Sequence, residues 1–172
     1  MNHKTAQAIV DSHGLSPAES LFVRAVAWHE TNYGQGWKTG EGAGSHNMGA
    51  ITDPSPDELS FKHVDSRFDP KKGKVVEYTT WFKGYVDDDA GFRDLEHTVL
   101  KSNVKEALEV GDVSAAVDAM YDNSYFKGIH PDRESNVADY QNAVSRAMSA
   151  ITGATGEAPI VPLAGESGAG EC

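Results

Sequence analysis

The chain has 172 residues, the length of one ordinary domain, and at that length it can bury a full core without disulfides. Its formal net charge of −11 argues against a protein that binds nucleic acid or an anionic membrane through a broad positive surface. The one cysteine, Cys172, is the last residue, which excludes an internal disulfide and a cysteine-based zinc site. We expect no membrane span, because no apolar run approaches roughly 20 residues, and no signal peptide, because the N-terminal stretch lacks a continuous apolar region.

The clearest local signal in the N-terminal half is a helix start at Ser16. Ser16 can cap the helix, Pro17 suits its first turn, and Glu19 completes a capping box. Apolar residues then recur at helical spacing until Asn-Tyr-Gly ends the pattern. Glu30 falls in the last turn, in line with the apolar stripe. Burial and the negative helix end both disfavour its carboxylate form, so we expect a raised pKa for Glu30.

The segment after this helix predicts a loop and then a small β-hairpin. Residues 34–60 are rich in Gly, Pro, Ser and Asp and are typical of a loop, with a short buried piece at residues 48–51. Residues 61–67 and 74–82 have strand composition, and the Asp-Pro-Lys-Lys-Gly segment at residues 69–73 is a turn signal between them.

The second half of the chain is helical up to a tail without periodicity. Its apolar stripes predict helices at residues 92–100, 104–108, 113–120 and 137–151. The expected fold is therefore α+β and mostly helical, with a small β-hairpin lobe and a cleft between the lobes. The expected domain covers residues 1–152, and the Gly-, Ala- and Pro-rich residues 153–172 are expected to form a flexible tail.

Three motifs occur in a recognisable order. A helix ends in Glu-Thr-Asn-Tyr-Gly, a box with the sequence Ser-His-Asn-Met-Gly-Ala-Ile follows at residues 45–51, and Trp-Phe-Lys-Gly-Tyr follows the hairpin at residues 81–85. This order resembles the lysozyme-like peptidoglycan hydrolases over roughly residues 15–150. It is most similar to the flagellar-type N-acetylglucosaminidases of glycoside hydrolase family 73, and the soluble lytic transglycosylases come second. Met-Gly-Ala in place of the family's Leu-Phe-Gly leans toward the transglycosylases.

The resemblance implies roles for individual residues. Glu30 matches the family's catalytic acid. The second acid falls on Asp69, with Asp65 on the same strand face as the alternative, although the family usually has glutamate there. Tyr121 and Tyr125 fall where the family keeps a tyrosine pair near the acid, and we prefer Tyr125 of the two.

Substrate-binding residues are expected in the box and among the aromatic side chains. Ser45 and Asn47 match the residues that line the floor of the family's cleft, and His46 between them could contact substrate or orient a neighbour. Aromatic rings suit a sugar site because the apolar faces of pyranose rings stack on them. The candidates for stacking are Tyr33, Trp37, Trp81 and Tyr125, although we expect core packing for Trp81 and Trp28.

The implied chemistry is cleavage of glycosidic bonds in the peptidoglycan glycan strand. An acid must protonate the bridging oxygen as an oxocarbenium-like centre forms, and a second carboxylate then activates water or stabilises the cation. Without a second carboxylate, the 6-hydroxyl of a muramic residue can complete the reaction and leave an anhydro-muramic end, as in lytic transglycosylases. Two non-catalytic alternatives also remain. One is a wall-binding or structural module of the same fold, and the other is an acidic inhibitor or adaptor protein.

Other site types have little support in the sequence. The His29-Glu30 pair begins like a zincin helix but lacks the second histidine one turn later. The Asp-Asp-Asp run at residues 87–89 lacks the remaining ligands of a calcium loop, and we expect it to cap the next helix. We expect no metal and no cofactor. The expected partner is the peptidoglycan strand, bound by a monomer. With no signal peptide, the protein is expected to be made in the cytoplasm and to reach the cell wall or periplasm with a phage particle, through a holin, or by a dedicated secretion apparatus.

Overall fold

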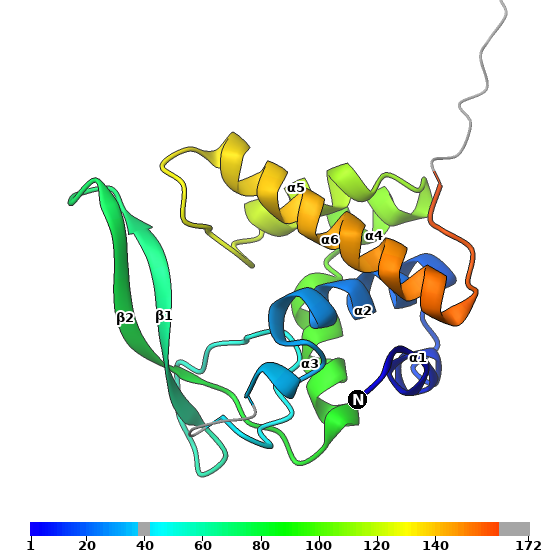
Figure 1. The fold of residues 1–172 in the computed structure, drawn as a ribbon, viewed down its shortest axis with the longest axis horizontal. Helices are drawn as coiled ribbons and strands as arrows, with labels where there is room; N and C mark the ends of the chain where they lie inside the picture. Colours follow the sequence, from blue (N-terminus) through cyan, green and yellow to red (C-terminus); the bar gives the residue numbers. More distant parts are fainter. Residues whose placement is uncertain (38–41, 162–172) are drawn as a thin grey trace, which may run out of the picture.

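The computed structural model describes residues 1–37 and 42–161, which form a helical lobe and a β-hairpin lobe (Figure 1). In chain order the elements of this part are α1 (His3–Asp11), α2 (Pro17–Thr31), the 3₁₀ helix η1 (Gln35–Trp37), β1 (Phe61–Asp69), β2 (Lys74–Phe82), α3 (Asp88–Val99), α4 (Ser102–Glu109), α5 (Val113–Asp122) and α6 (Arg133–Thr155). The mostly helical α+β class predicted from the sequence is confirmed. Helix α1 is additional, because the sequence pattern did not predict it.

Helix α2 is the central element of the helical lobe and packs against α1, α3, α4 and α6. It begins at the predicted capping box: the Ser16 hydroxyl accepts a hydrogen bond from the Glu19 amide, and the Glu19 carboxylate accepts one from the Ser16 amide. Every residue from 20 to 27 is buried. A helix that is buried on all sides lies inside the fold rather than on its surface, so α2 provides a rigid base for the residues at its C-terminal end.

The end of α2 turns the chain sharply back toward the core. Asn32 and Tyr33 are both in the left-handed region, with φ of 50° and 55°, and Gly34 follows with φ of 73°. The Thr31 hydroxyl donates a hydrogen bond to the carbonyl of Met48 at 2.8 Å and accepts one from the amide of Gly34. The last turn of α2 is therefore tied to the 45–51 box.

The hairpin is anchored at its base and otherwise extends away from the helices (Figure 1). Its register pairs Phe61 with Phe82 at the base and Asp69 with Lys74 at the turn. Phe61 and Phe82 pack with Trp37 in a small buried cluster. An isolated two-stranded hairpin is only marginally stable in water, and this aromatic cluster contributes to securing the β lobe to the rest of the protein.

The C-terminal segment packs against the helical lobe instead of leaving the fold at residue 153. Helix α6 continues to Thr155 and ends at Gly156, which has φ of 81°. The carboxylate of Glu157 then accepts two hydrogen bonds from the fully buried Arg24, from Nη1 at 2.9 Å and from Nη2 at 2.6 Å. The first residues of the expected tail are therefore part of the fold, whereas residues 162–172 lie outside the described residues.

Among the residues that the structure describes, no helix combines the length and the apolar character needed to cross a membrane.

Candidate active site

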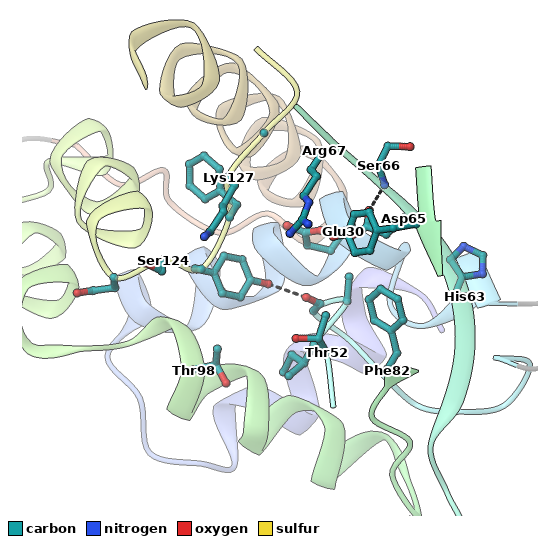
Figure 2. A pocket seen from close by; sticks show the side chains of 18 of the residues that line it. Glu30, Thr52, His63, Asp65, Ser66, Arg67, Phe82, Thr98, Ser124 and Lys127 are labelled. Atoms are coloured by element: carbon teal, nitrogen blue, oxygen red, sulfur yellow. Dashed lines mark hydrogen bonds between the residues drawn. The ribbon is translucent and has the colours of Figure 1, made fainter. Parts of the chain in front are cut away.

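A cleft of about 700 Å³ lies between the hairpin and the helical lobe (Figure 2). The inward face of the hairpin forms one wall, the ends of α3 and α5 with the loop that follows α5 form the other, and the end of α2 reaches the cleft between them. The interlobe cleft predicted from the sequence is confirmed.

Glu30 lines this cleft from the last turn of α2. Its Oε1 accepts a hydrogen bond of 2.5 Å from the hydroxyl of Tyr140 on α6. Burial is the main cause that raises the pKa of Glu30 to about 7; the negative charge of Asp65 raises it further, and the Tyr140 hydrogen bond acts in the opposite direction. The predicted rise in the pKa of Glu30 is confirmed. Near neutral pH a large share of Glu30 is protonated and can donate a proton.

Asp65 lines the same cleft from the hairpin wall, on β1 (Figure 2). Its carboxylate accepts hydrogen bonds from the hydroxyl of Tyr78, its cross-strand partner, at 2.8 Å and from the amide of Ser66 at 2.7 Å. The guanidinium of Arg67 lies 4.7 Å from the centre of the Tyr78 ring. These contacts hold a second carboxylate in a defined position in the cleft.

Asp69, the first choice for the second acid, lies at the hairpin turn and is not among the residues that line the cleft. Its carboxylate accepts hydrogen bonds from the amides of Lys71 and Lys72. An aspartate that starts a turn commonly accepts a hydrogen bond from the backbone amide two residues on, and the Asp69 carboxylate has this role in the hairpin turn. The structure therefore brings Asp65, and not Asp69, to the cleft that contains Glu30.

Two tyrosines accompany Glu30, but only one of them is in the expected pair. Tyr125 lines the cleft, and its hydroxyl donates a hydrogen bond to the carbonyl of Gly49 at 2.8 Å. The second is Tyr140 on α6, within the stretch at residues 137–151 that the sequence predicted as a helix. A buried tyrosine usually finds a partner for its hydroxyl, and that rule is the signal that could have singled out Tyr140. Tyr121 does not line the cleft, and its ring packs against that of Phe126, which does.

The side chain of Asn47 stabilises the box instead of lining the cleft. Its side chain is fully buried. The amide nitrogen donates to the carbonyls of Ile51 and Lys83, and the amide oxygen accepts from the amides of Gly49 and Ile51. Asn47 thus ties the box to the end of β2. The part of the box that reaches the cleft is Gly49, together with the two residues that follow it.

The remaining expected binding residues also lie outside the cleft lining. Ser45 accepts a weak 3.4 Å hydrogen bond from the Asn47 amide, and His46 Nδ1 lies 2.7 Å from a carboxylate oxygen of Asp88. Tyr33 is only 3% exposed and hydrogen-bonds with His3 in the core, because the left-handed turn after α2 directs it inward. The substrate-binding role expected for Tyr33 is therefore not compatible with its burial.

The tryptophans differ from one another in their environments. Trp37 is buried at the base of the hairpin, where its indole nitrogen donates a hydrogen bond to the Asn47 carbonyl, and it is among the residues that line the cleft. Trp28 packs against the core, as predicted. The prediction of core packing for Trp81 is wrong: Trp81 is 36% exposed, with Lys62 Nζ 4.9 Å from its ring. Strand alternation turns Phe82 inward and Trp81 outward.

We expect Asn47→Ala to destabilise the fold, because it removes four hydrogen bonds that a fully buried side chain makes to backbone groups of the box and of Lys83. A loss of about 2–4 kcal/mol in the free energy of unfolding is typical of such a network. Urea unfolding of the variant measures it. Ser45→Ala is the matched control and should lose less than about 1 kcal/mol, since it removes a single long hydrogen bond. Equal losses in the two variants would contradict a structural role for Asn47.

We expect Glu30→Gln to stabilise the fold at alkaline pH. Burial raises the pKa of Glu30 from 4.5 to about 7. The stability associated with the protonated form is therefore fully present below the unfolded pKa and is lost as the pH rises through about 7. Above that pH the wild type carries a penalty of at most about 3 kcal/mol that glutamine avoids.

Urea unfolding of both proteins at about pH 5 and about pH 8 measures this effect. The free energy of unfolding of the glutamine variant, relative to that of the wild type, should be larger at about pH 8 than at about pH 5. A stability difference that stays constant with pH would show that Glu30 does not titrate in this range.

No group of three or more His, Cys, Asp or Glu side chains in residues 1–37 and 42–161 is arranged to hold a metal ion.

Comparison with known proteins shows the fold. No family model matches the sequence, and no curated protein matches it. Among solved structures, a peptidoglycan hydrolase mutant from Sphingomonas sp. A1 superimposes with a TM-score of 0.60 at 17% identity, over 86% of this chain and 90% of that one. A C-terminally truncated glycoside hydrolase domain from Salmonella typhimurium FlgJ has a TM-score of 0.52 at 11% identity, over 87% and 92% of the two chains. The chain has the fold of these hydrolases, as its sequence motifs predicted.

Proposed function

We propose that the protein is a glycoside hydrolase that cleaves the glycan strands of peptidoglycan. The observation that carries the proposal is Glu30, whose pKa is raised to about 7 in a cleft between two lobes, with the carboxylate of Asp65 on the hairpin wall of the same cleft. A pair of acids whose environments differ is the arrangement that glycosidic cleavage requires. The fold is shared with a peptidoglycan hydrolase and a glycoside hydrolase domain, which supports the substrate class.

In the proposed reaction Glu30 is the general acid. Its carboxyl proton passes to the bridging oxygen as the bond between that oxygen and the anomeric carbon breaks. The leaving sugar departs with a new hydroxyl group, and positive charge develops on the anomeric carbon and ring oxygen. Tyr140 keeps its hydrogen bond to the Glu30 carboxylate that remains, which stabilises the ionised form after proton transfer.

Asp65 is the proposed second group. Its carboxylate faces the cleft and can accept a proton from a water molecule as that water attacks the anomeric carbon. The proton that Asp65 has taken from water then returns through solvent to Glu30, which restores both groups for the next cycle. The position of Asp65 supports hydrolysis over the internal attack of a lytic transglycosylase, because internal attack does not need a carboxylate to activate water.

The proposal also fixes where the protein must act. Peptidoglycan lies outside the cytoplasmic membrane, so the protein has to reach the cell wall or periplasm. A phage particle, a holin or a dedicated secretion apparatus is the proposed route. One chain contributes both Glu30 and Asp65 to the cleft, which supports action as a monomer.

Digestion of purified peptidoglycan, with the products identified by mass spectrometry, tests the function. Products with a new reducing end support hydrolysis: a reducing N-acetylglucosamine end identifies a glucosaminidase, and a reducing muramic end identifies a muramidase. Anhydro-muramic ends, lighter by one water, would identify a lytic transglycosylase instead. A folded protein that releases no soluble product and still sediments with the wall would be a binding module, and the proposal would be wrong.

A further inference from the structure

The cleft is lined by more basic than acidic side chains, although the whole protein has a large negative charge. The chain has 26 acidic and 15 basic residues. Of the described residues that line the cleft, the acids are Glu30 and Asp65, and the cations are Arg67, Lys101 and Lys127. Because a large share of Glu30 is protonated near neutral pH, the cleft is a positive region in a strongly negative protein. Such a concave positive region concentrates anionic groups.

Two of these cations lie on the wall opposite the hairpin. Lys127 belongs to the loop between α5 and α6, and Figure 2 shows it on the far side of the cleft from Asp65. Lys101 directly precedes α4, and its ammonium donates a hydrogen bond to the carbonyl of His97 at 2.7 Å. A carbonyl group orients the ammonium without neutralising its charge.

The same wall offers hydrogen-bonding groups and no competing carboxylate among its described lining residues. Thr98 and Ser124 have hydroxyl groups there, and both lie beside the cleft in Figure 2. Asp122, at the end of α5, forms an ion pair with Arg133 at 3.0 Å and does not line the cleft. The positive charge of this wall is therefore available to a ligand.

In a strand that carries stem peptides the sugars are neutral, because the carboxyl group of each substituted muramic residue is amide-linked to its peptide, so the sugars do not account for two lysines on one wall. In peptidoglycan the negative charges belong to the short peptides attached to the muramic residues, which have free carboxylates. We propose that Lys101 and Lys127 form a subsite for carboxylates of this stem peptide, an inference that rests on the proposed function. Lysine binds a carboxylate as a point charge without strict geometry, which suits a flexible peptide. The protein would thus prefer strands whose stem peptides have ionised carboxylates over the same strands with neutral, amidated peptides.

The test compares two substrates that differ only in charge: peptidoglycan, and the same peptidoglycan with its free carboxyl groups converted to amides. The Lys101→Gln/Lys127→Gln double variant is compared with the wild type on both. We expect the wild type to cleave the charged substrate about tenfold faster at low salt, and the preference to decrease as salt screens the charges. In the double variant the ratio of the two rates should fall close to one. Lys101→Arg/Lys127→Arg should keep the preference.

A matched control removes the same charge elsewhere. Lys4→Gln/Lys71→Gln changes two exposed lysines that do not line the cleft, and it should show the wild-type ratio. A wild type that cleaves both substrates equally, or a Lys101/Lys127 glutamine variant that keeps the preference, would overturn the subsite and leave the proposed function intact.

A wild type that cleaves neither substrate would contradict the proposed function. Sedimentation with the two insoluble substrates still tests the subsite in that case. Binding that favours the charged substrate and loses this preference in the glutamine double variant supports the subsite, whereas equal binding overturns it.

Discussion

Glu30→Gln is expected to lower the rate of glycan cleavage by about 10³-fold, within the range that general acid catalysis contributes. Glutamine has the same shape and can still accept the hydrogen bond that Tyr140 donates, but it has no proton to give to the bridging oxygen. The rate of release of soluble saccharides from purified peptidoglycan measures the effect.

The matched control for this variant is Glu106→Gln, which makes the same chemical change on the exposed side of α4. It should cleave at the wild-type rate. If Glu30→Gln kept wild-type turnover in a folded protein, Glu30 would not be the acid.

Asp65→Asn is expected to lower the rate by about 10²-fold, the lower end of the same range. Asparagine can keep the hydrogen bond from Tyr78 through its amide oxygen, so the hairpin wall is retained while the base for the attacking water is lost. The variant should also lose activity at a lower pH than the wild type, since the charge of Asp65 contributes to the raised pKa of Glu30.

Asp69→Asn is the comparison for this second prediction. Asp69 binds backbone amides of the turn and does not line the cleft, so its substitution should act on the hairpin turn and not on the chemistry. Similar rate losses in the two aspartate variants would contradict the assignment of Asp65. A wild-type rate for Asp65→Asn would instead favour completion of the reaction by a group of the substrate.

Local signals in the sequence were sufficient for the elements that position the site. The capping box at Ser16 predicted the start of α2, and its apolar stripe and end signals placed Glu30 in the last turn, where the structure has it. Asp87 accepts a hydrogen bond from the amide of the third residue after it, as expected of the helix cap predicted there. Helix caps and turns depend on residues within a few positions of one another, so they can be predicted without knowledge of the fold.

The direction of individual side chains could not be predicted in the same way. Tyr33 lies three residues after Glu30, and a continued helix would leave it near the same face. The left-handed backbone at Asn32 and Tyr33 turns it into the core instead. For Asp65 and Asp69 the sequence placed both on the hairpin, but which of them reaches the cleft depends on the packing of the two lobes, and the structure has only Asp65 in the cleft lining.

Contacts between distant segments account for the other differences. Tyr140 reaches Glu30 across 110 positions of sequence, and Glu157 reaches Arg24 across 133. Periodicity shows that a tyrosine faces the core, but it does not show which polar atom its hydroxyl meets there. In the same way, low periodicity after residue 152 predicted a tail, although a single buried arginine binds the first part of that segment.

The dependence of kcat/KM on pH, measured on soluble glycan strands with the wild-type protein, tests most directly whether Glu30 acts as the general acid. This profile reports the pKa of the essential acid in the free enzyme. Because the pKa of Glu30 is about 7, we predict that kcat/KM decreases as the pH rises through about 7. A profile that begins to decrease near the ordinary pKa of a glutamate, or that stays level well above neutral pH, would contradict Glu30 as the proton donor.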